Sequence, residues 1–171
     1  MAGSSSEHRF AVDSMLGRLA KWLRILGHDT FYCPPAARAE LAARAAEEGR
    51  TVLTQDHRLA SSLRRLPTDQ GPARAILIHS DHLPEQLRQL RGEVGGLTGP
   101  EFSRCLRCNA VLKREHADAV QGQVPDFIRQ HYAAFARCPT CERVYWAGTH
   151  HRRMKELLGQ LALDEASPDP S

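Results

Sequence analysis

Residues 10–33 read FAVDSMLGRLAKWLRILGHDTFYC, which is an apolar run, an amphipathic segment and a second apolar run. We predict a buried strand over residues 10–12 and a helix over residues 14–26, because leucines recur there at the spacing of one helix face. Gly27 can end this helix, and residues 30–33 predict a second strand. A strand, a helix and a strand in this order are typical of a parallel pair joined by a right-handed crossover.

The same alternation continues along the chain to residue 91. Strands are expected at Thr51–Thr54 and Ala75–Ile78, helices at Ala36–Glu48, His57–Leu66 and from Pro84 to Leu90, and a polar loop at Pro67–Pro72. Strands that alternate with helices predict an α/β fold with a mostly parallel sheet flanked by helices. We place this domain at residues 9–91. Residues 92–100 hold four glycines and a proline, and we expect them to form a linker.

The composition is that of an ordinary globular chain. Of 171 residues, 42% are hydrophobic and 25% are charged, which disfavours a collagen-like or wholly disordered chain. No apolar run approaches the roughly 18 residues of a membrane span, and the first residues lead into no hydrophobic signal core. We therefore expect a cytoplasmic protein with no membrane partner. The net charge of +3 does not demand a polyanionic partner, so local basic faces are more informative than the total.

Three acids follow predicted strands: Asp13, Asp56 and Asp81. The carboxyl ends of parallel strands share one edge of an open sheet, and ligands bind there. Acids gathered at that edge would repel one another unless a cation lay between them, and oxygen ligands of this kind suit Mg²⁺ or Mn²⁺. Such a cation can activate water and stabilise an in-line phosphoryl displacement. Glu40, in the second helix, can reach the same edge.

Each of these acids also has a simpler interpretation. An aspartate before a helix can cap it, and Glu40 can belong to a solvated helix face. The prediction of a cation site therefore depends on the joint placement of the acids. Arg18, Lys21 and Arg24 span a broad face of the first helix, where they either hold the phosphates of a polyanion or form a solvated face.

Four of the five cysteines form two Cys-x-x-Cys pairs, Cys105 with Cys108 and Cys138 with Cys141. Two such pairs complete the tetrahedral four-cysteine site of structural Zn²⁺, which has no open position for catalysis. A redox dithiol would need only one pair beside a strand and a helix, and iron in a rubredoxin-like site would use the same ligands. We place this module at residues 102–154. The end of a terminal helix and a disordered tail are expected over residues 155–171.

Three stretches together resemble the Mut-7 C-terminal RNase domain family, a group of PIN-like nucleases. They are residues 10–30, EEGRTVLTQDHRL at 47–59 and RCPTCERVYWAGTHHRRM at 137–154. The resemblance covers about residues 9–154. It implies a PIN-like, mostly parallel sheet flanked by helices with a small C-terminal zinc ribbon whose metal four cysteines hold. It also implies a ribonuclease that cleaves RNA at an acidic site dependent on Mg²⁺ or Mn²⁺.

The resemblance assigns roles to individual acids. Asp13 matches the acid of the first strand and Asp56 the acid after Leu-Thr-x, whereas Asp81 matches only loosely. PIN-like proteins usually carry another acid near the start of the helix before that strand. This chain has Arg38 there, with Glu40 two residues later. Asp13 and Asp56 are thus expected to hold the cation, with Glu40 or Asp81 completing its shell.

The leading hypothesis is a metal-dependent ribonuclease in which Arg18, Lys21 and Arg24 position the RNA and the zinc ribbon extends the RNA surface. Two other hypotheses stay open. Arg38 motivates a non-catalytic RNA-binding module on the same fold. A module that binds only a protein, whose identity the sequence does not give, is the third.

Overall fold

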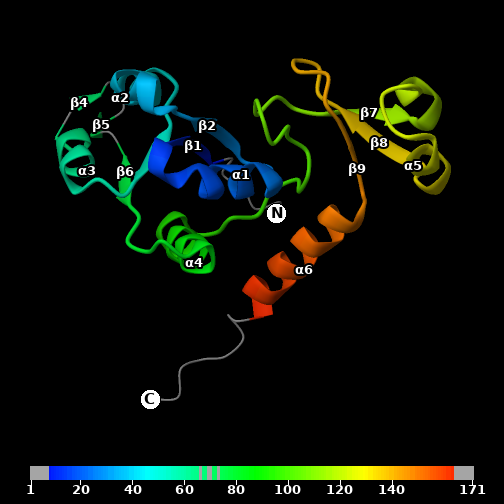
Figure 1. The fold of residues 1–171 in the computed structure, drawn as a ribbon. Helices are drawn as coiled ribbons and strands as arrows, with labels where there is room; N and C mark the ends of the chain where they lie inside the picture. The colour runs from blue at the N-terminus through cyan, green and yellow to red at the C-terminus, as the bar shows by residue number, and fades with distance from the viewer. Residues whose placement is uncertain (1–7, 66, 69–70, 73, 164–171) are drawn as a thin grey trace, which may run out of the picture. The chain divides into compact units, whose positions relative to one another are not determined.

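The computed structural model describes residues 8–65, 67–68, 71–72 and 74–163. The chain divides into two compact units that meet in sequence between Asn109 and Ala110, and Figure 1 labels the elements of both. Within the described residues, no helix has the length and apolar character that crossing a membrane requires.

The first unit is built on a four-stranded sheet in the order β2-β1-β3-β6, with every neighbouring pair parallel. The strands are β1 at Arg9–Val12, β2 at Asp29–Tyr32, β3 at Thr51–Thr54 and β6 at Ala75–Leu77. The two central strands, β1 and β3, are the apolar runs that burial on both faces demands. Val12 pairs with Tyr32 on one side and Leu53 on the other. The residues that follow β1 and β3 therefore leave the sheet at the same edge.

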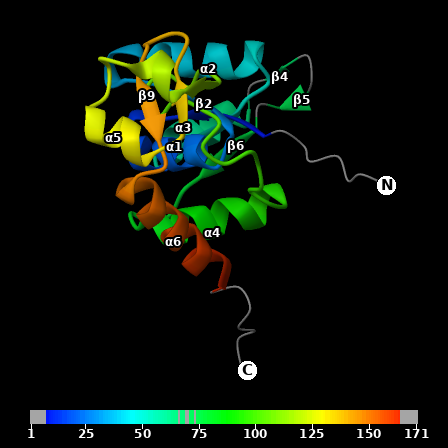
Figure 2. The same ribbon diagram turned by 90° about the vertical axis from the view of Figure 1, so that its right-hand side faces the viewer.

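Helices cover both faces of this sheet. They are α1 at Gly17–Ile25, α2 at Arg38–Glu47, α3 at His57–Leu63 and α4 at Leu83–Val94, with 3-10 turns η1 at Ser14–Leu16 and η2 at Pro35–Ala37. Helix α1 packs against β2 and α4, whereas α2 packs against β1 and β3. Figures 1 and 2 show α2 and α4 on opposite sides of the sheet. The predicted α/β fold with a mostly parallel sheet is confirmed.

Two layers of apolar side chains hold the helices to the sheet. Ala11 and Val52 belong to one buried cluster with Leu41 of α2 and Leu63 of α3. Phe10, the neighbour of Ala11 in β1, points to the other face because side chains alternate along a strand, and it is fully buried. Burying a side chain of this size contributes about 1.5–3 kcal/mol, so the core fixes the positions of the strand ends.

Two segments differ from the expected elements. The expected polar loop at 67–72 contains the two-residue strands β4, Pro67–Thr68, and β5, Gly71–Pro72, which pair antiparallel. Helix α4 continues to Val94, into the expected linker, because a glycine such as Gly92 costs a helix only about 1 kcal/mol. The helix ends at Gly95, whose φ of 77° lies in the left-handed region that suits glycine.

Residues 99–109 pack against the end of α1. The N–H of Phe102 donates to the carbonyl of Ile25 at 2.7 Å, and Arg104 Nε donates to the carbonyl of Gly27 at 3.1 Å. A Cβ on Gly99 would stand 2.5 Å from the carbonyl oxygen of Leu26, so only glycine fits this approach. Much of the sequence between α4 and the second unit is thereby part of the first unit.

The second unit contains an antiparallel three-stranded sheet in the order β7-β8-β9. Its elements are β7 at Lys113–His116, η3 at Ala117–Val120, α5 at Asp126–His131, β8 at Ala134–Arg137, β9 at Val144–Trp146 and α6 at Thr149–Leu163. Val120, Val124 and Phe135 form its small buried core. Folding of residues 102–154 as an independent module stays a prediction. Of residues 155–171, where the end of a helix and a disordered tail were expected, residues 155–163 belong to α6 and residues 164–171 lie outside the described residues.

Candidate active site and metal centre

Asp13 directly follows β1 and is almost fully buried, at 1% exposure. Its Oδ1 accepts the N–H of Ser14 at 2.7 Å, and its Oδ2 accepts the hydroxyl of Thr54 at 2.8 Å. The same hydroxyl accepts the N–H of Asp56 at 3.0 Å. Thr54, the last residue of β3, thus joins the two aspartates and fixes the orientation of the Asp13 carboxylate.

Asp56 is the N-cap of α3. Its Oδ1 accepts the N–H groups of Arg58 at 2.8 Å and Leu59 at 3.1 Å. The backbone bond from Leu59 and the ion pair with Arg38 lower the pKa of the Asp56 carboxyl below its usual range. Capping and cation binding, which the sequence left as alternatives, are compatible here because capping uses only Oδ1.

Arg38, the first residue of α2, lies between the two aspartates. Its Nη2 is 3.8 Å from Oδ2 of Asp13 and forms an ion pair with Oδ2 of Asp56. Two carboxylate oxygens from different strands therefore converge on one positively charged nitrogen. We refer to Asp13, Asp56 and Arg38 together as the acidic site.

Glu40 lies in the first turn of α2 and is exposed. Glu40 and Asp13 both act on Cys33, a buried thiol that directly follows β2. Burial raises the pKa of the Cys33 thiol first, the negative charges of Asp13 and Glu40 raise it further, and Arg38 opposes them. Both acids thus lie within electrostatic range of one thiol.

Asp81 is exposed and its Oδ1 accepts Nε2 of Gln55 at 2.8 Å. Gln55 precedes Asp56, so Asp81 lies beside the segment that carries the acidic site. Among the described residues, the acids do not form a group of three or more closely spaced metal-ligating atoms. The structure brings Asp13 and Asp56 together and places Glu40 and Asp81 further out.

The three basic residues predicted on the first helix differ in exposure. Arg18 and Lys21 are exposed, whereas Arg24 is only 7% exposed. The Arg24 guanidinium donates to the carbonyl of Thr30 at 2.9 and 3.0 Å and to the carbonyls of Leu106 and Arg107. Arg24 thus ties α1 to residues 106–107. RNA contacts by these three residues stay a prediction.

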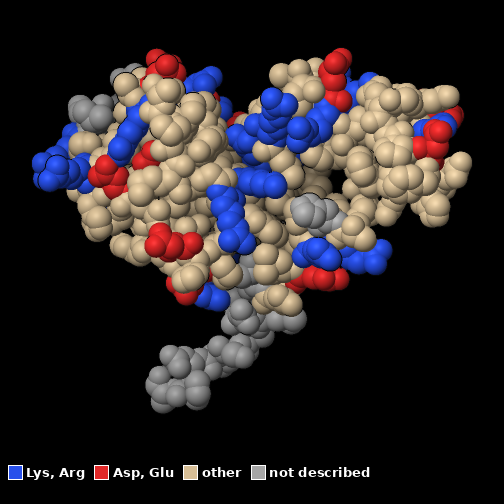
Figure 3. All heavy atoms as spheres, viewed as in Figure 1, with Lys and Arg blue, Asp and Glu red and all other residues tan. Residues whose placement is uncertain are grey.

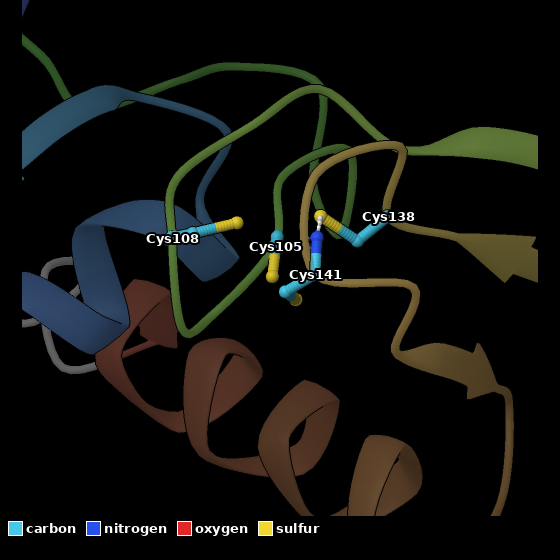
Figure 4. A group of neighbouring side chains, drawn as sticks. All are labelled: Cys105, Cys108, Cys138 and Cys141. Atoms are coloured by element: carbon cyan, nitrogen blue, oxygen red, sulfur yellow. Dashed lines mark hydrogen bonds between the residues drawn. The ribbon is translucent and has the colours of Figure 1, made fainter.

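The four predicted zinc ligands come together. The sulfur atoms of Cys105, Cys108, Cys138 and Cys141 all lie within 4.8 Å of one another, and Figure 4 shows the four side chains in one group. No disulfide joins these four cysteines, since all of them are free.

The backbone of both cysteine pairs has the same geometry. The residue after each second cysteine, Asn109 or Glu142, has a left-handed φ of 70° or 60°. Its N–H donates to the carbonyl of the first cysteine of its pair, at 2.9 Å in one and 3.0 Å in the other. Sγ of Cys138 also accepts the N–H groups of Thr140 and Cys141, both at 3.4 Å. Such turns direct two thiolates of each pair to one point, which is what tetrahedral metal coordination requires.

Comparison with protein families gives a match to the Mut7-C RNAse domain over residues 8–158. The chain belongs to the Mut7-C RNAse domain family. Comparisons with curated proteins and with solved structures found no match. The resemblance expected from three short stretches is confirmed, and it extends over both units of the chain. Membership of the Mut7-C family indicates ribonuclease activity with RNA as the substrate.

In this Mut7-C chain, Asn109 has a role that the sequence did not predict. Its Nδ2 donates to Oδ1 of Asp29 at 2.7 Å, and its Oδ1 accepts the N–H of Thr30 at 3.0 Å. Asn109 therefore connects the first cysteine pair to β2. The sequence could have indicated the turn, because asparagine tolerates the left-handed conformation better than most residues. It could not have indicated the two hydrogen-bond partners, which lie 79 and 80 positions away.

Proposed function

We propose that this protein is a ribonuclease that depends on Mg²⁺ or Mn²⁺ and holds the cation with Asp13 and Asp56. The observation that carries this proposal is the convergence of Oδ2 of both aspartates on the single Nη2 of Arg38. Oxygens placed in this way need positive charge between them, and carboxylate oxygens are the protein ligands that Mg²⁺ prefers. When bound, the cation supplies charge stabilisation for displacement at a phosphodiester.

The surrounding residues prepare the two carboxylates. Thr54 and Ser14 hold Asp13 in one orientation, so that its Oδ2 faces the acidic site. The N-terminus of α3 keeps Asp56 ionised, because the helix end favours negative charge. Glu40, whose charge acts on the same Cys33 thiol as that of Asp13, is the acid that we assign to the outer part of the cation shell, and Asp81 is the alternative.

Arg38 must leave the acidic site before a cation enters it. Its side chain is 46% exposed, and water screens an ion pair at that exposure. A divalent cation at millimolar concentration can therefore compete with this guanidinium. In this proposal Arg38 is the counter-ion that the cation displaces from Asp13 and Asp56.

Cleavage of a labelled single-stranded RNA panel with Mn²⁺, Mg²⁺ or EDTA tests the proposal. We expect cleavage that requires the cation and disappears in Asp13→Asn/Asp56→Asn, which keeps a hydrogen-bond acceptor on both side chains. The melting temperature should stay similar or rise, since two repelling acids are removed. On α2, Glu40→Gln should slow cleavage whereas the exposed Glu47→Gln should not. Unchanged cleavage by the double variant would exclude this site.

Arg38 also favours a second function, RNA binding without catalysis. A guanidinium that stays on both aspartates would prevent a cation from binding and leave an RNA-binding module. In that case RNA binding survives Asp13→Asn, and no cation gives cleavage. Absence of RNA affinity even at low salt, where phosphate contacts are strongest, would instead favour a protein-interaction module.

We also propose that the four cysteines hold a structural Zn²⁺. Four thiolates form the closed donor set of such sites, and the paired turns described above support it. Zinc in this position would link the polypeptide around Cys105 to that around Cys138 without taking part in cleavage. A cytoplasmic location, where thiols stay reduced, fits this assignment and stays a prediction.

A further inference from the structure

A pocket of about 340 Å³ opens in the first unit beside β2, the edge strand of the sheet. Four arginines line it, together with a single acid, Glu48. The arginines are Arg24, Arg44, Arg50 and Arg107, and we call this cavity the arginine pocket. None of its arginines except Arg24 was a candidate binding residue from the sequence.

Two of the arginines form a fixed inner wall. Arg24 is 7% exposed and Arg50 is 9% exposed. Arg50 donates to Oδ1 of Asp29 at 2.7 Å and to Oε2 of Glu48 at 2.6 Å. Burial alone would raise the pKa of the Asp29 carboxyl, but hydrogen bonds from Arg50 and Asn109 bring it below its usual range. These charges are already ordered, so a ligand would not have to immobilise them.

The other two arginines are available to a ligand. Arg44 holds its guanidinium 4.4 Å over the ring of Phe31, and its side chain is 48% exposed. Arg107 is exposed, and its guanidinium makes no hydrogen bond or ion pair with the described part of the chain. Glu48 is already engaged by Arg44 at 3.0 Å as well as by Arg50. The pocket is therefore strongly biased towards anions.

Guanidinium groups match phosphate oxygens in geometry as well as charge. Phosphate is also the recurring group of the substrate that the family description implies. Basic side chains gather in local groups on the face drawn in Figure 3, although the net charge of the chain is only +3. Local grouping of this kind is what a phosphate contact needs.

The arginine pocket is connected to the acidic site. Arg38 and Arg44 lie on the same helix, six residues apart, which is about 9 Å along the helix axis. Tyr32, which lines the pocket, donates its hydroxyl to the carbonyl of Ser14, the residue after Asp13. An extended strand lying along this surface can reach both places.

We propose that the arginine pocket binds a phosphate group of the RNA strand, held by Arg44 and Arg107, at a distance from the bond that is cut. The proposal rests on the proposed RNA substrate but not on catalysis. It deepens the function by naming a subsite that fixes the strand relative to Asp13 and Asp56.

The test is the salt dependence of RNA binding by the full-length, zinc-loaded protein without added Mg²⁺ or Mn²⁺. The probe is a short single-stranded RNA labelled at its 3′ end, and the readout is fluorescence anisotropy from 0.05 to 1 M salt. The variants are Arg107→Gln and Arg44→Gln/Arg107→Gln. Arg65→Gln, an exposed arginine outside the pocket, is the matched control.

Each lost phosphate contact on a single strand should reduce the slope of log K against log salt by about 0.7. We expect a decrease of about 0.7 for Arg107→Gln and about 1.4 for the double variant. Over the decade from 1 M to 0.1 M salt, the double variant then loses about 25-fold in affinity relative to the native protein. Arg65→Gln should lose less than either pocket variant. If the double variant is poorly folded, the single Arg107→Gln decides, because the Arg107 guanidinium makes no hydrogen bond or ion pair with the described residues.

Slopes for both pocket variants equal to those of the native protein and Arg65→Gln would overturn the proposal, and so would failure of the native protein to bind RNA at 0.05 M salt. Comparing a 5′-hydroxyl with a 5′-monophosphate oligonucleotide distinguishes an internal from a terminal phosphate as the ligand. A protein that binds through the pocket but does not cleave would contradict the nuclease proposal alone. One that cleaves with unchanged slopes would contradict the pocket alone.

Discussion

Arg38 compensates the negative charge of the acidic site, but it opposes the binding of the cation that the proposed catalysis needs. In the absence of a cation, its guanidinium compensates two carboxylates, one of them buried. The hydrogen bond that it donates to Asp56, followed by the charge of Asp13, raises the pKa of Arg38 above its usual value, so the counter-ion stays charged at any pH that RNA tolerates. The same residue competes with the cation that the proposed reaction needs.

The variant Arg38→Ala therefore has two expected effects. Without a cation its melting temperature should fall, because the charges of Asp13 and Asp56 lose their partner. The Mn²⁺ concentration for half-maximal cleavage should fall about two- to fivefold, since an exposed ion pair is a weak competitor. Thermal melts with and without Mn²⁺ check this independently of cleavage, and Arg38→Lys is the charge-preserving control. An Mn²⁺ requirement unchanged from the native protein would contradict the competition.

At the scale of the element, the two cysteine turns repeat one backbone design. In each, a left-handed residue and a bond to the carbonyl of the first cysteine set the separation of two sulfur atoms. The first turn is also tied to the sheet by Asn109 and Arg24. Loss of one thiolate should consequently release the metal and loosen the segment around Cys105.

We expect Cys105→Ser to lose zinc and to show a lower melting temperature, because metal binding is coupled to folding at such sites. The zinc content of the purified variant, measured against protein concentration, checks this. Cys33→Ser is the control, since Cys33 is a buried cysteine outside the group of four. Full zinc content in Cys105→Ser would rule out the four-cysteine assignment.

Several elements could be predicted because their signals are local. The apolar runs of β1 and β3 and the acids one or two residues after them are local features of the sequence, so the edge that carries Asp13 and Asp56 was expected. The continuation of α4 over residues 92–94 was not expected, because the four glycines of residues 92–100 indicated a linker. The arginine pocket could not be predicted from the sequence, because only the fold brings Arg44 and Arg107 together. Arg38 was noticed as a departure from the family, but its contact with both aspartates required its side-chain position.

At the scale of the whole molecule, the contacts of residues 102–109 decide where the first unit ends. Phe102, Arg104 and Asn109 all bond to residues between Ile25 and Thr30. A fragment that ends before them would leave those backbone groups without these partners, and buried polar groups without partners are costly. The Gly92–Pro100 run alone does not mark where this unit ends.

Two fragments test this boundary, one covering residues 8–109 and one covering residues 8–101. We expect the longer fragment to melt cooperatively at the higher temperature, as followed by circular dichroism. Replacing Asn109 by alanine in the longer fragment should remove part of the difference, because the bonds to Asp29 and Thr30 are lost. Equal melting temperatures for the two fragments would show that the 102–109 segment adds nothing to the first unit.

The glycines after α4 have a practical use. A Cβ at Gly95 or Gly96 would meet nothing within 4 Å, whereas at Gly99 it would collide with the carbonyl of Leu26. The first pair therefore has open space beside it, whereas Gly99 has no room even for a methyl group. The N–H of Gly96 donates to the carbonyl of Arg91 at the end of α4, so a short peptide epitope placed after Gly96 would keep this bond and give a handle for surface immobilisation, leaving Asp13, Arg44 and the cysteines in their native sequence surroundings.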